Sequence, residues 1–172
     1  FDSEKNVIYA GSNGSGIIYR CETSTGCDEA ADWTTAYDGP QSCIYSFALD
    51  QTNNVIYAVG SGASDNIVRC DTSTGCDEDT DWSRAYGTGL TFYSVTFDST
   101  NNVVYAGNVS GYIYRCDSNL NTCINGDGWT SYDTGESAVE SLTFDATNDV
   151  LYAGTSSNGI IFRCDTTING QA

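Results

Sequence analysis

The chain has 172 residues, with 23 Asp or Glu against 6 Lys or Arg, and a formal net charge of −17. Such a charge leaves no basic surface that could displace counterions from phosphate, so we expect no nucleic-acid partner. The sequence also contains no run of eighteen apolar residues, so we expect no membrane insertion.

The cysteine and histidine content narrows the class of protein further. The chain has eight cysteines and no histidine. Histidine is the commonest general base, so its absence excludes nucleophile schemes of the Ser-His and Cys-His type, and we expect no enzymatic activity. Frequent cysteine without histidine favours disulfides formed in an oxidising compartment, which predicts a secreted or cell-surface protein.

One segment, typified by Phe-Asp-Ser-Thr-Asn-Asn-Val-Val-Tyr-Ala-Gly, occurs four times along the chain. The copies cover Phe1–Gly11, Leu49–Gly60, Phe97–Gly107 and Phe144–Gly154. Their shared Asp residues are separated by 48, 48 and 47 residues. Self-similarity at a fixed period of this length indicates a repeat architecture.

Within each repeat the sequence predicts four short strands in a fixed order. An alternating strand ends in Phe-Asp, as at Val139 to Asp145, and a strand of the Val-Ile-Tyr-Ala-Gly type follows it. The third strand ends in Arg-Cys, as at Ile17 to Cys21, and the fourth begins at a Trp such as Trp33. These runs are rich in β-branched and aromatic residues and are bounded by Asn, Gly, Asp and Ser, as strands are. Four strands in 47 to 48 residues predict an all-β fold, a β-propeller built of four-stranded antiparallel blades.

The predicted propeller occupies residues 1–172 as a single domain. Its repeats span approximately 1–43, 44–91, 92–138 and 139–172, which makes about four blades. Two are incomplete, because the first lacks most of its opening strand and the fourth lacks its Trp strand. The chain is therefore a small four-bladed ring, a part of a larger ring, or a protomer completed by a neighbour, since an unpaired edge strand invites pairing in trans.

The cysteines fall into two groups. Three local pairs lie between the third and fourth strands, and we expect each to form a disulfide that closes a short loop: Cys21 with Cys27, Cys70 with Cys76, and Cys116 with Cys123. Cys43 and Cys164 have no local counterpart. They either pair within the chain, locking the first blade to the last, or pair between chains.

Two further sets of polar residues are candidate sites. Carboxylates follow the first two disulfides and are candidate ligands of calcium, the one cofactor that the sequence suggests: Asp28, Asp32, Asp77, Asp79 and Asp81. The alternative is an acidic loop that is simply solvated. Asn13 and Asn108 each begin an Asn-X-Ser pattern predicted to lie in a loop, which makes both candidates for N-glycosylation.

Residues that recur in register favour structural roles. An Arg precedes the repeated Cys in every repeat, at Arg20, Arg69, Arg115 and Arg163. We expect these side chains to pair with the Asp of Phe-Asp or to cover a strand face. The repeated Tyr and Trp are expected to pack in the core or between blades.

The repeat, read as FDSTNNVVYAG…YIYRC…WT…DTG, resembles the bacterial neuraminidase repeat, or Asp-box, type of propeller. Its period and strand order are also similar to those of tachylectin-2-like lectin propellers. Where the Asp-box has Ser-x-Asp-x-Gly-x-Thr-Trp, this chain has Cys-Asp-Thr-Ser-Thr-Gly-Cys at Cys70 to Cys76. The resemblance implies a propeller fold, and lectin propellers hold sugars in pockets between their blades.

These observations lead to three functional hypotheses. The first is a non-catalytic extracellular module for binding or adhesion, with glycans as its partners. The second is a structural subunit of an extracellular filament or surface layer, whose partners are other copies of itself and whose blades are completed between chains. The third is a fragment of a larger propeller hydrolase.

Overall fold

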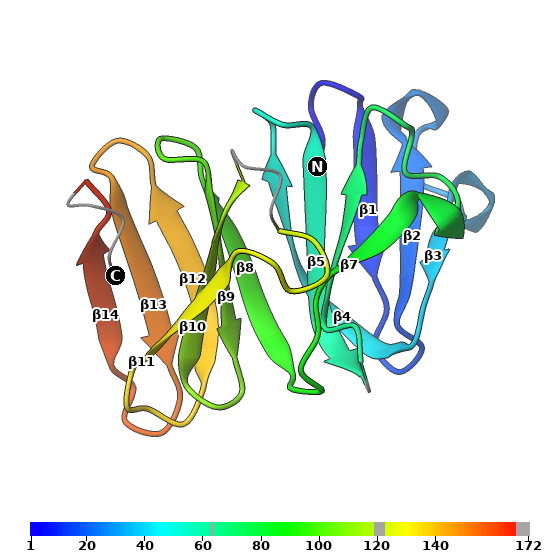
Figure 1. The fold of residues 1–172 in the computed structure, drawn as a ribbon. Coiled ribbons are helices and arrows are strands. Elements are labelled where there is room, and N and C mark those ends of the chain that lie inside the picture. Colours follow the sequence, from blue (N-terminus) through cyan, green and yellow to red (C-terminus); the bar gives the residue numbers. More distant parts are fainter. Residues whose placement is uncertain (63, 119–122, 168–172) are drawn as a thin grey trace.

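The protein is described by a computed structural model over residues 1–62, 64–118 and 123–167. Four antiparallel sheets follow one another along the chain and stand side by side, each sheet being one blade of a β-propeller (Figure 1). The predicted fold class is therefore confirmed. The first and last blades lie at opposite ends of the row, so the described residues form an open array rather than the closed four-bladed ring that the sequence allowed.

The second and third blades each have four strands in simple sequential order. The second blade consists of β4 (Gln41–Asp50), β5 (Val55–Gly62), β6 (Ile67–Asp71) and β7 (Trp82–Tyr86). The third consists of β8 (Phe92–Asp98), β9 (Val103–Asn108), β10 (Tyr112–Asp117) and β11 (Trp129–Asp133). Because β4 begins at Gln41, the second blade starts ahead of the repeat boundary that the sequence placed between residues 43 and 44.

The first and fourth blades have three strands each among the described residues. The first consists of β1 (Val7–Gly11), β2 (Ile17–Glu22) and β3 (Thr34–Asp38). The fourth consists of β12 (Val139–Asp145), β13 (Val150–Thr155) and β14 (Ile161–Asp165). Three short 3-10 helices lie in the loops of the first two blades: Thr23–Thr25, Ala30–Asp32 and Asp79–Asp81. None of the helices in the described ranges has the length and apolar character needed to cross a bilayer.

The repeated Asp of Phe-Asp shapes the hairpin between the first two strands of a blade. Asp50 accepts hydrogen bonds from the backbone N–H of Asn53 at 2.9 Å and from its side-chain amide at 2.9 Å. The next residue, Asn54, has φ = 56°, a conformation that asparagine tolerates better than most residues do. The same turn recurs with Asn102 at φ = 56° and Asp149 at φ = 52°. The repeated sequence thus fixes the same hairpin in successive blades.

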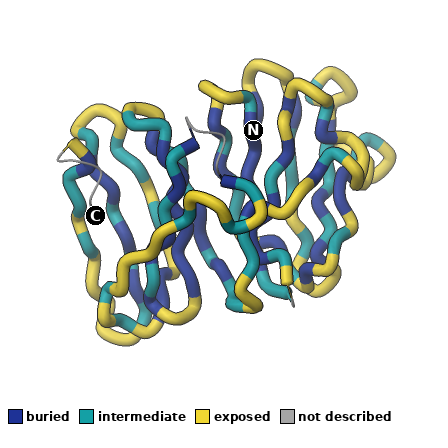
Figure 2. Tube along the Cα trace, in the orientation of Figure 1, coloured by how far each residue is buried: buried dark blue, intermediate teal, exposed yellow. Residues whose placement is uncertain are grey.

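The core lies between the blades rather than inside any one of them. Three buried clusters occupy the three junctions between successive blades, and the largest lies between the second and third. Figure 2 shows buried residues concentrated along the strands and exposed residues in the connections. Each blade therefore depends on its neighbours for the burial of its two faces, as is general in repeat proteins.

Candidate functional site

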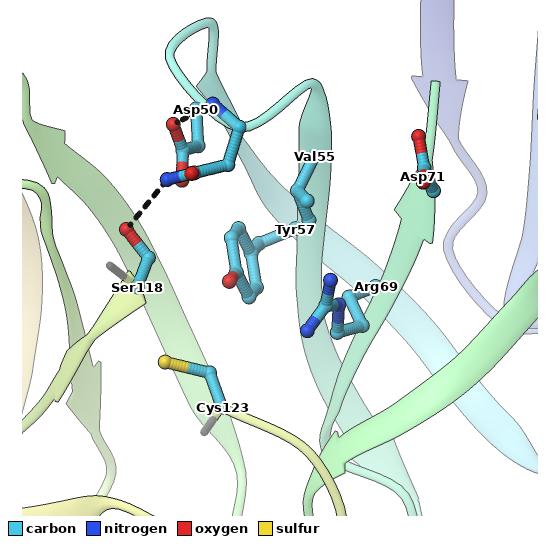
Figure 3. Close-up of a pocket in the computed structure, with 8 residues that line it drawn as sticks. Asp50, Val55, Tyr57, Arg69, Asp71, Ser118 and Cys123 are labelled. Carbon is cyan, nitrogen blue, oxygen red and sulfur yellow. Dashed lines mark hydrogen bonds between the residues drawn. The ribbon is translucent and has the colours of Figure 1, made fainter. Parts of the chain in front are cut away.

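A polar pocket opens at the junction of the second and third blades (Figure 3). Its volume is about 220 Å³, and its walls come from the strands β5 and β6, the hairpin before β5, and two residues at the Cys116–Cys123 disulfide, Ser118 and Cys123. The lining residues are Asp50, Asn53, Val55, Tyr57, Arg69, Asp71, Ser118 and Cys123. Most of these side chains carry donors or acceptors, so the pocket suits a polar ligand.

One wall of the pocket is a hydrogen-bonded chain that joins the two blades. The side-chain amide of Asn53, held by Asp50, donates to Oγ of Ser118 at 3.4 Å. Ser118 Oγ donates in turn to the backbone carbonyl of Asn102 at 2.8 Å. Asp50 is fully buried and Ser118 nearly so. This wall is held by both blades, so a ligand would meet preformed polar groups rather than flexible ones.

The floor of the pocket is formed by Tyr57 and Arg69, which face each other across the β5–β6 pair. The guanidinium carbon of Arg69 lies 5.9 Å from the centre of the Tyr57 ring, within the range of a cation–π interaction. Figure 3 shows both side chains extending from their strands into the space between the blades. At the rim, Asp71 Oδ1 accepts hydrogen bonds from the backbone and hydroxyl of Ser73 at 2.9 and 2.6 Å.

Burial controls the protonation of the tyrosine. Loss of solvent raises the pKa of Tyr57 to about 12, and the nearby positive charge of Arg69 offsets only a part of that increase. The phenol therefore stays protonated at neutral pH and keeps its O–H donor. With a guanidinium, a phenol, an amide, a hydroxyl and two carboxylates, the pocket offers both donors and acceptors in a small volume.

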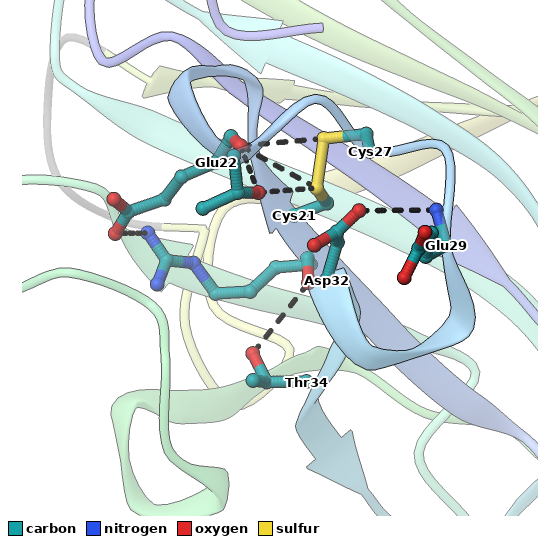
Figure 4. The surroundings of a disulfide bond; sticks show 8 residues. Cys21, Glu22, Cys27, Glu29, Asp32 and Thr34 are labelled. Atoms are coloured by element: carbon teal, nitrogen blue, oxygen red, sulfur yellow. Dashed lines mark hydrogen bonds and ion pairs between the residues drawn. A yellow bond between two sulfur atoms is a disulfide. The ribbon is translucent and has the colours of Figure 1, made fainter.

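The three predicted disulfides are present. Cys21 is bonded to Cys27, Cys70 to Cys76, and Cys116 to Cys123. Figure 4 shows the first of them closing the loop that follows β2. Thr25 within this loop donates its hydroxyl hydrogen bond to the carbonyl of Glu22 at 2.7 Å. The third disulfide brings Cys123 to the wall of the pocket.

Cys43 and Cys164 keep their thiols, so the pairing that would lock the first blade to the last is not formed. Cys43 lies in β4, and its Sγ is 3.1 Å from Oδ1 of Asn13 in the first blade. Cys164 lies in β14 and packs on the cluster between the third and fourth blades, where burial raises the pKa of its thiol. Pairing between chains stays a prediction, and burial of Cys164 opposes it.

The carboxylates predicted as calcium ligands are not brought together. Asp32 Oδ2 accepts the backbone N–H of Glu29 at 3.0 Å, and both residues lie beside the first disulfide (Figure 4). Asp81 caps the equivalent turn of the second blade, and Asp79 accepts the backbone N–H of Asp38 in β3 at 2.9 Å. Within the described ranges no three acidic side chains gather as metal ligands would. These carboxylates cap turns or, as Asp28 and Asp77 do, stand exposed to solvent, so the structure does not support a calcium site there.

The two glycosylation candidates differ. Asn13 is exposed in the turn between β1 and β2. Asn108 was predicted in a loop, but it ends β9 and is fully buried. Its Oδ1 accepts the backbone N–H groups of Ser110 and Tyr112 at 3.0 and 2.9 Å, and its amide nitrogen is buried as well. Asn108 is therefore a turn-forming residue whose buried side chain leaves no room for a glycan in the folded structure.

Sequence reasoning did not single out the pocket residues as a site, although the signal was present. Asp50, Tyr57 and Arg69 recur at equivalent positions in every repeat, which favoured a structural interpretation. That interpretation holds in part, because Arg69 does cover the strand face beside Tyr57. What the repeat could not show is that a cavity remains between these residues and the next blade.

Comparison with known proteins supports the fold alone. No family model matches the chain, and no curated protein is similar to it in sequence. Among solved structures, a chain from the crystal structure of a nidogen/laminin complex superposes with a TM-score of 0.74 at 17% identity, covering 99% of this chain. An auxiliary nutrient binding protein from Bacteroides thetaiotaomicron superposes with a TM-score of 0.70 at 13% identity, covering 96% of this chain. This chain spans 60% of the first and 37% of the second.

Proposed function

We propose that this propeller is a non-catalytic, extracellular binding module that holds one saccharide unit of a glycan in the pocket between its second and third blades. The observation that carries the proposal is the pocket itself, a preformed cavity of about 220 Å³ with Arg69 and Tyr57 on its floor. Its volume is below the roughly 300–1,000 Å³ of sites for drug-sized ligands, which favours a single sugar ring over an extended oligosaccharide.

The chemistry of the lining favours a neutral sugar. Sugar hydroxyls both donate and accept, and the pocket matches them with the guanidinium of Arg69, the side-chain amide of Asn53 and the carboxylate of Asp71. The net charge of −17 repels anionic ligands at a distance, so acidic sugars are disfavoured.

The extracellular setting and the lack of catalysis rest on separate observations. Three disulfides that close loops of this size persist where thiols are oxidised. The chain lacks histidine, and the carboxylates of the pocket recur in the other repeats, unlike a singular catalytic pair. The names of the two structural neighbours, one a nidogen/laminin complex and one a nutrient binding protein, describe binding proteins and are compatible with this proposal.

The test is a glycan array followed by calorimetric titration with the monosaccharide that the array selects. We expect Arg69→Ala to abolish binding, because it removes the cationic donor of the pocket. Arg163→Ala is the matched control, since Arg163 is the same repeat residue in the fourth blade, where it is exposed. Unchanged affinity in Arg69→Ala with retained melting temperature, or an array without any binding, would contradict the proposal.

A structural subunit is the second candidate, and one observation favours it. The outer edge of β14 has no fourth strand beside it among the described residues, so its backbone groups on that side are available for pairing. A strand from another chain would then complete the blade. Non-reducing electrophoresis would show a ladder if Cys43 and Cys164 also cross-link the chains, and a single band after oxidation contradicts such cross-linking.

A further inference from the structure

The same isoleucine, at the start of the third strand, occurs in all four blades but has a different environment in the last. Its copies are Ile18, Ile67, Ile113 and Ile161, each paired with the second strand at equivalent positions. The first three are 0%, 0% and 6% exposed, whereas Ile161 is 72% exposed. The residue is buried wherever another blade follows in the described chain, so it is the following blade that buries it.

The partners that bury this isoleucine also repeat. Ile67 belongs to the same buried cluster as Ala106 and Tyr114 of the third blade, and Trp129 packs against that cluster. The equivalent residues of the second blade, Ala58, Val68 and Trp82, share a cluster with Ile18. Ile113 likewise clusters with Ala153 and Phe162 of the fourth blade. One blade supplies an isoleucine, and the next supplies an alanine, a larger apolar residue and, in the complete blades, a tryptophan.

The first blade has the same set of apolar residues, but no isoleucine of a preceding blade packs against it. Ala10, Tyr19 and Trp33 are the equivalent residues, and with Ala30 they line an apolar groove of about 320 Å³. Ala10 and Tyr19 are only partly buried, whereas Ala58 and Ala106 are fully buried under the preceding blade. The open face of the last blade thus presents a protruding apolar side chain, and the open face of the first blade presents the groove that receives it.

A hydrogen bond that recurs between successive blades has its donor on the open face of the last blade and its acceptor on the open face of the first. Asn53 donates to Ser118 at 3.4 Å, and Asn101 donates to Thr166 at 3.3 Å, across successive junctions. Asn148 is the same donor in the last blade, held by Asp145 at 2.7 Å, and no side chain of another blade accepts from it within the described ranges. Thr23 is the equivalent acceptor in the first blade, placed by its backbone bond to Asn6 at 2.9 Å.

We propose that the open face of the fourth blade docks on the open face of the first blade of a second copy of this chain. Ile161 enters the groove of Ala10, Tyr19 and Trp33, and Asn148 donates to Thr23, so the contact repeats the junctions inside the chain. The contact is head to tail, which requires closure into a ring or growth into a filament. Closure with two copies makes eight blades, which is within the four to eight typical of propellers, and this closed dimer is the assembly that we propose.

The proposal is independent of the saccharide pocket, which lies within one chain. Because each copy carries a charge of −17, association must overcome repulsion between like charges. Added salt screens that repulsion, so the dimer fraction rises with ionic strength, opposite to an interface held by ion pairs.

Light scattering and sedimentation of the full chain over a dilution series test the proposal. The expected mass is twice the 18.4 kDa of one chain, decreasing to a monomer on dilution. Ile161→Glu and Ala10→Arg each block one face, so each variant alone is expected to stay monomeric. Val109→Glu is the matched control, because Val109 is 36% exposed in the turn after β9 and lies on neither open face.

Mixing the two blocked variants separates docking from misfolding. Ile161→Glu keeps an intact first blade and Ala10→Arg keeps an intact fourth blade, so an equimolar mixture is expected to regain a two-chain species. A wild-type chain that is monomeric at its highest soluble concentration overturns the proposal, as does a mixture that stays monomeric while both variants unfold like the wild type. A ladder of larger masses overturns closure by two copies.

Discussion

The second and fourth blades carry nearly the same residues but differ in what those residues do. Asp50 and Tyr57 are buried and Arg69 is partly covered, whereas their counterparts in the fourth blade, Asp145, Tyr152 and Arg163, are all more exposed. The second blade has a following blade against this face and the fourth has none in the described chain. The comparison teaches that the repeat determines which side chains a face presents, and the neighbouring blade determines whether they become core or surface.

We expect alkaline pH to unfold the protein, because it ionises tyrosines that are buried only by a neighbouring blade. Burial raises the pKa of Tyr57, Tyr105 and Tyr114 to about 12 from an ordinary value of 10. A raised pKa in the folded state gives stability that is complete below pH 10 and is lost as pH rises toward 12. We expect cooperative unfolding in that window, followed by circular dichroism and tyrosinate absorbance together. Ionisation of these tyrosines near pH 10 without unfolding would contradict the assignment.

Shortening the repeated isoleucine gives the sharpest contrast between the two blades. Ile67→Ala leaves a cavity in a closed junction and should cost about 2–5 kcal/mol of unfolding free energy. Ile161→Ala removes an exposed side chain and should change the same quantity by less than about 0.5 kcal/mol. Urea unfolding, at a dilution where scattering shows the monomer, measures both. Equal losses would mean that Ile161 is buried within its own chain.

The disulfides extend the comparison to the loops. Replacing Cys70 and Cys76 by serine should lower the unfolding free energy by about 2–3 kcal/mol, because the unfolded chain gains conformational freedom. Burial of a serine hydroxyl at position 76 should add to this loss, because Cys76 is fully buried. The same change at Cys21 and Cys27 should cost less, since Cys27 is partly exposed. Thermal unfolding of the two double variants tests this order. A larger loss of stability in the first-blade variant would contradict the conclusion that burial makes the second disulfide the more important one.

The smallest expected difference concerns the hydrogen bond between blades. Asn53→Ala removes the side-chain hydrogen bonds to both Asp50 and Ser118 and should lower the unfolding free energy by about 1 kcal/mol. In Asn148→Ala only the bond to the exposed Asp145 is lost, so the unfolding free energy of the monomer should change less. That bond is the main cause lowering the pKa of Asp145, so the carboxyl pKa should rise in this variant. Titration of Asp145 by NMR, with unfolding of both variants, provides the check.

Sequence reasoning predicted the features that depend on local chemistry. The period of 47 to 48 residues, the strand order and the three local disulfides follow from residue types at fixed spacing, and the structure has them. It placed Asn108 in a loop because an Asn-X-Ser pattern does not reveal that the Asn side chain folds back on two backbone N–H groups. It proposed calcium because carboxylates close in sequence look like ligands, although several of them cap separate turns.

The location of the pocket and the residues of the two open faces could not be predicted from the sequence, for a different reason. Both depend on how two blades fit together, and identical repeats give identical expectations for each face. Only the arrangement of the blades distinguishes Arg69, beside a cavity, from Arg163, which is exposed. Features of this kind belong to pairs of repeats rather than to one repeat.

Amide hydrogen exchange, at a dilution where the chain is monomeric, tests most directly whether the neighbouring blade decides the role of a repeated strand. The account predicts that β5 exchanges only through global unfolding, while its counterpart β13, which is likewise paired on both sides, exchanges through local opening. A saccharide bound in the pocket should slow exchange further around β5 and leave β13 unchanged. Equal protection of the two strands would contradict the account, because burial would then follow from the repeat alone.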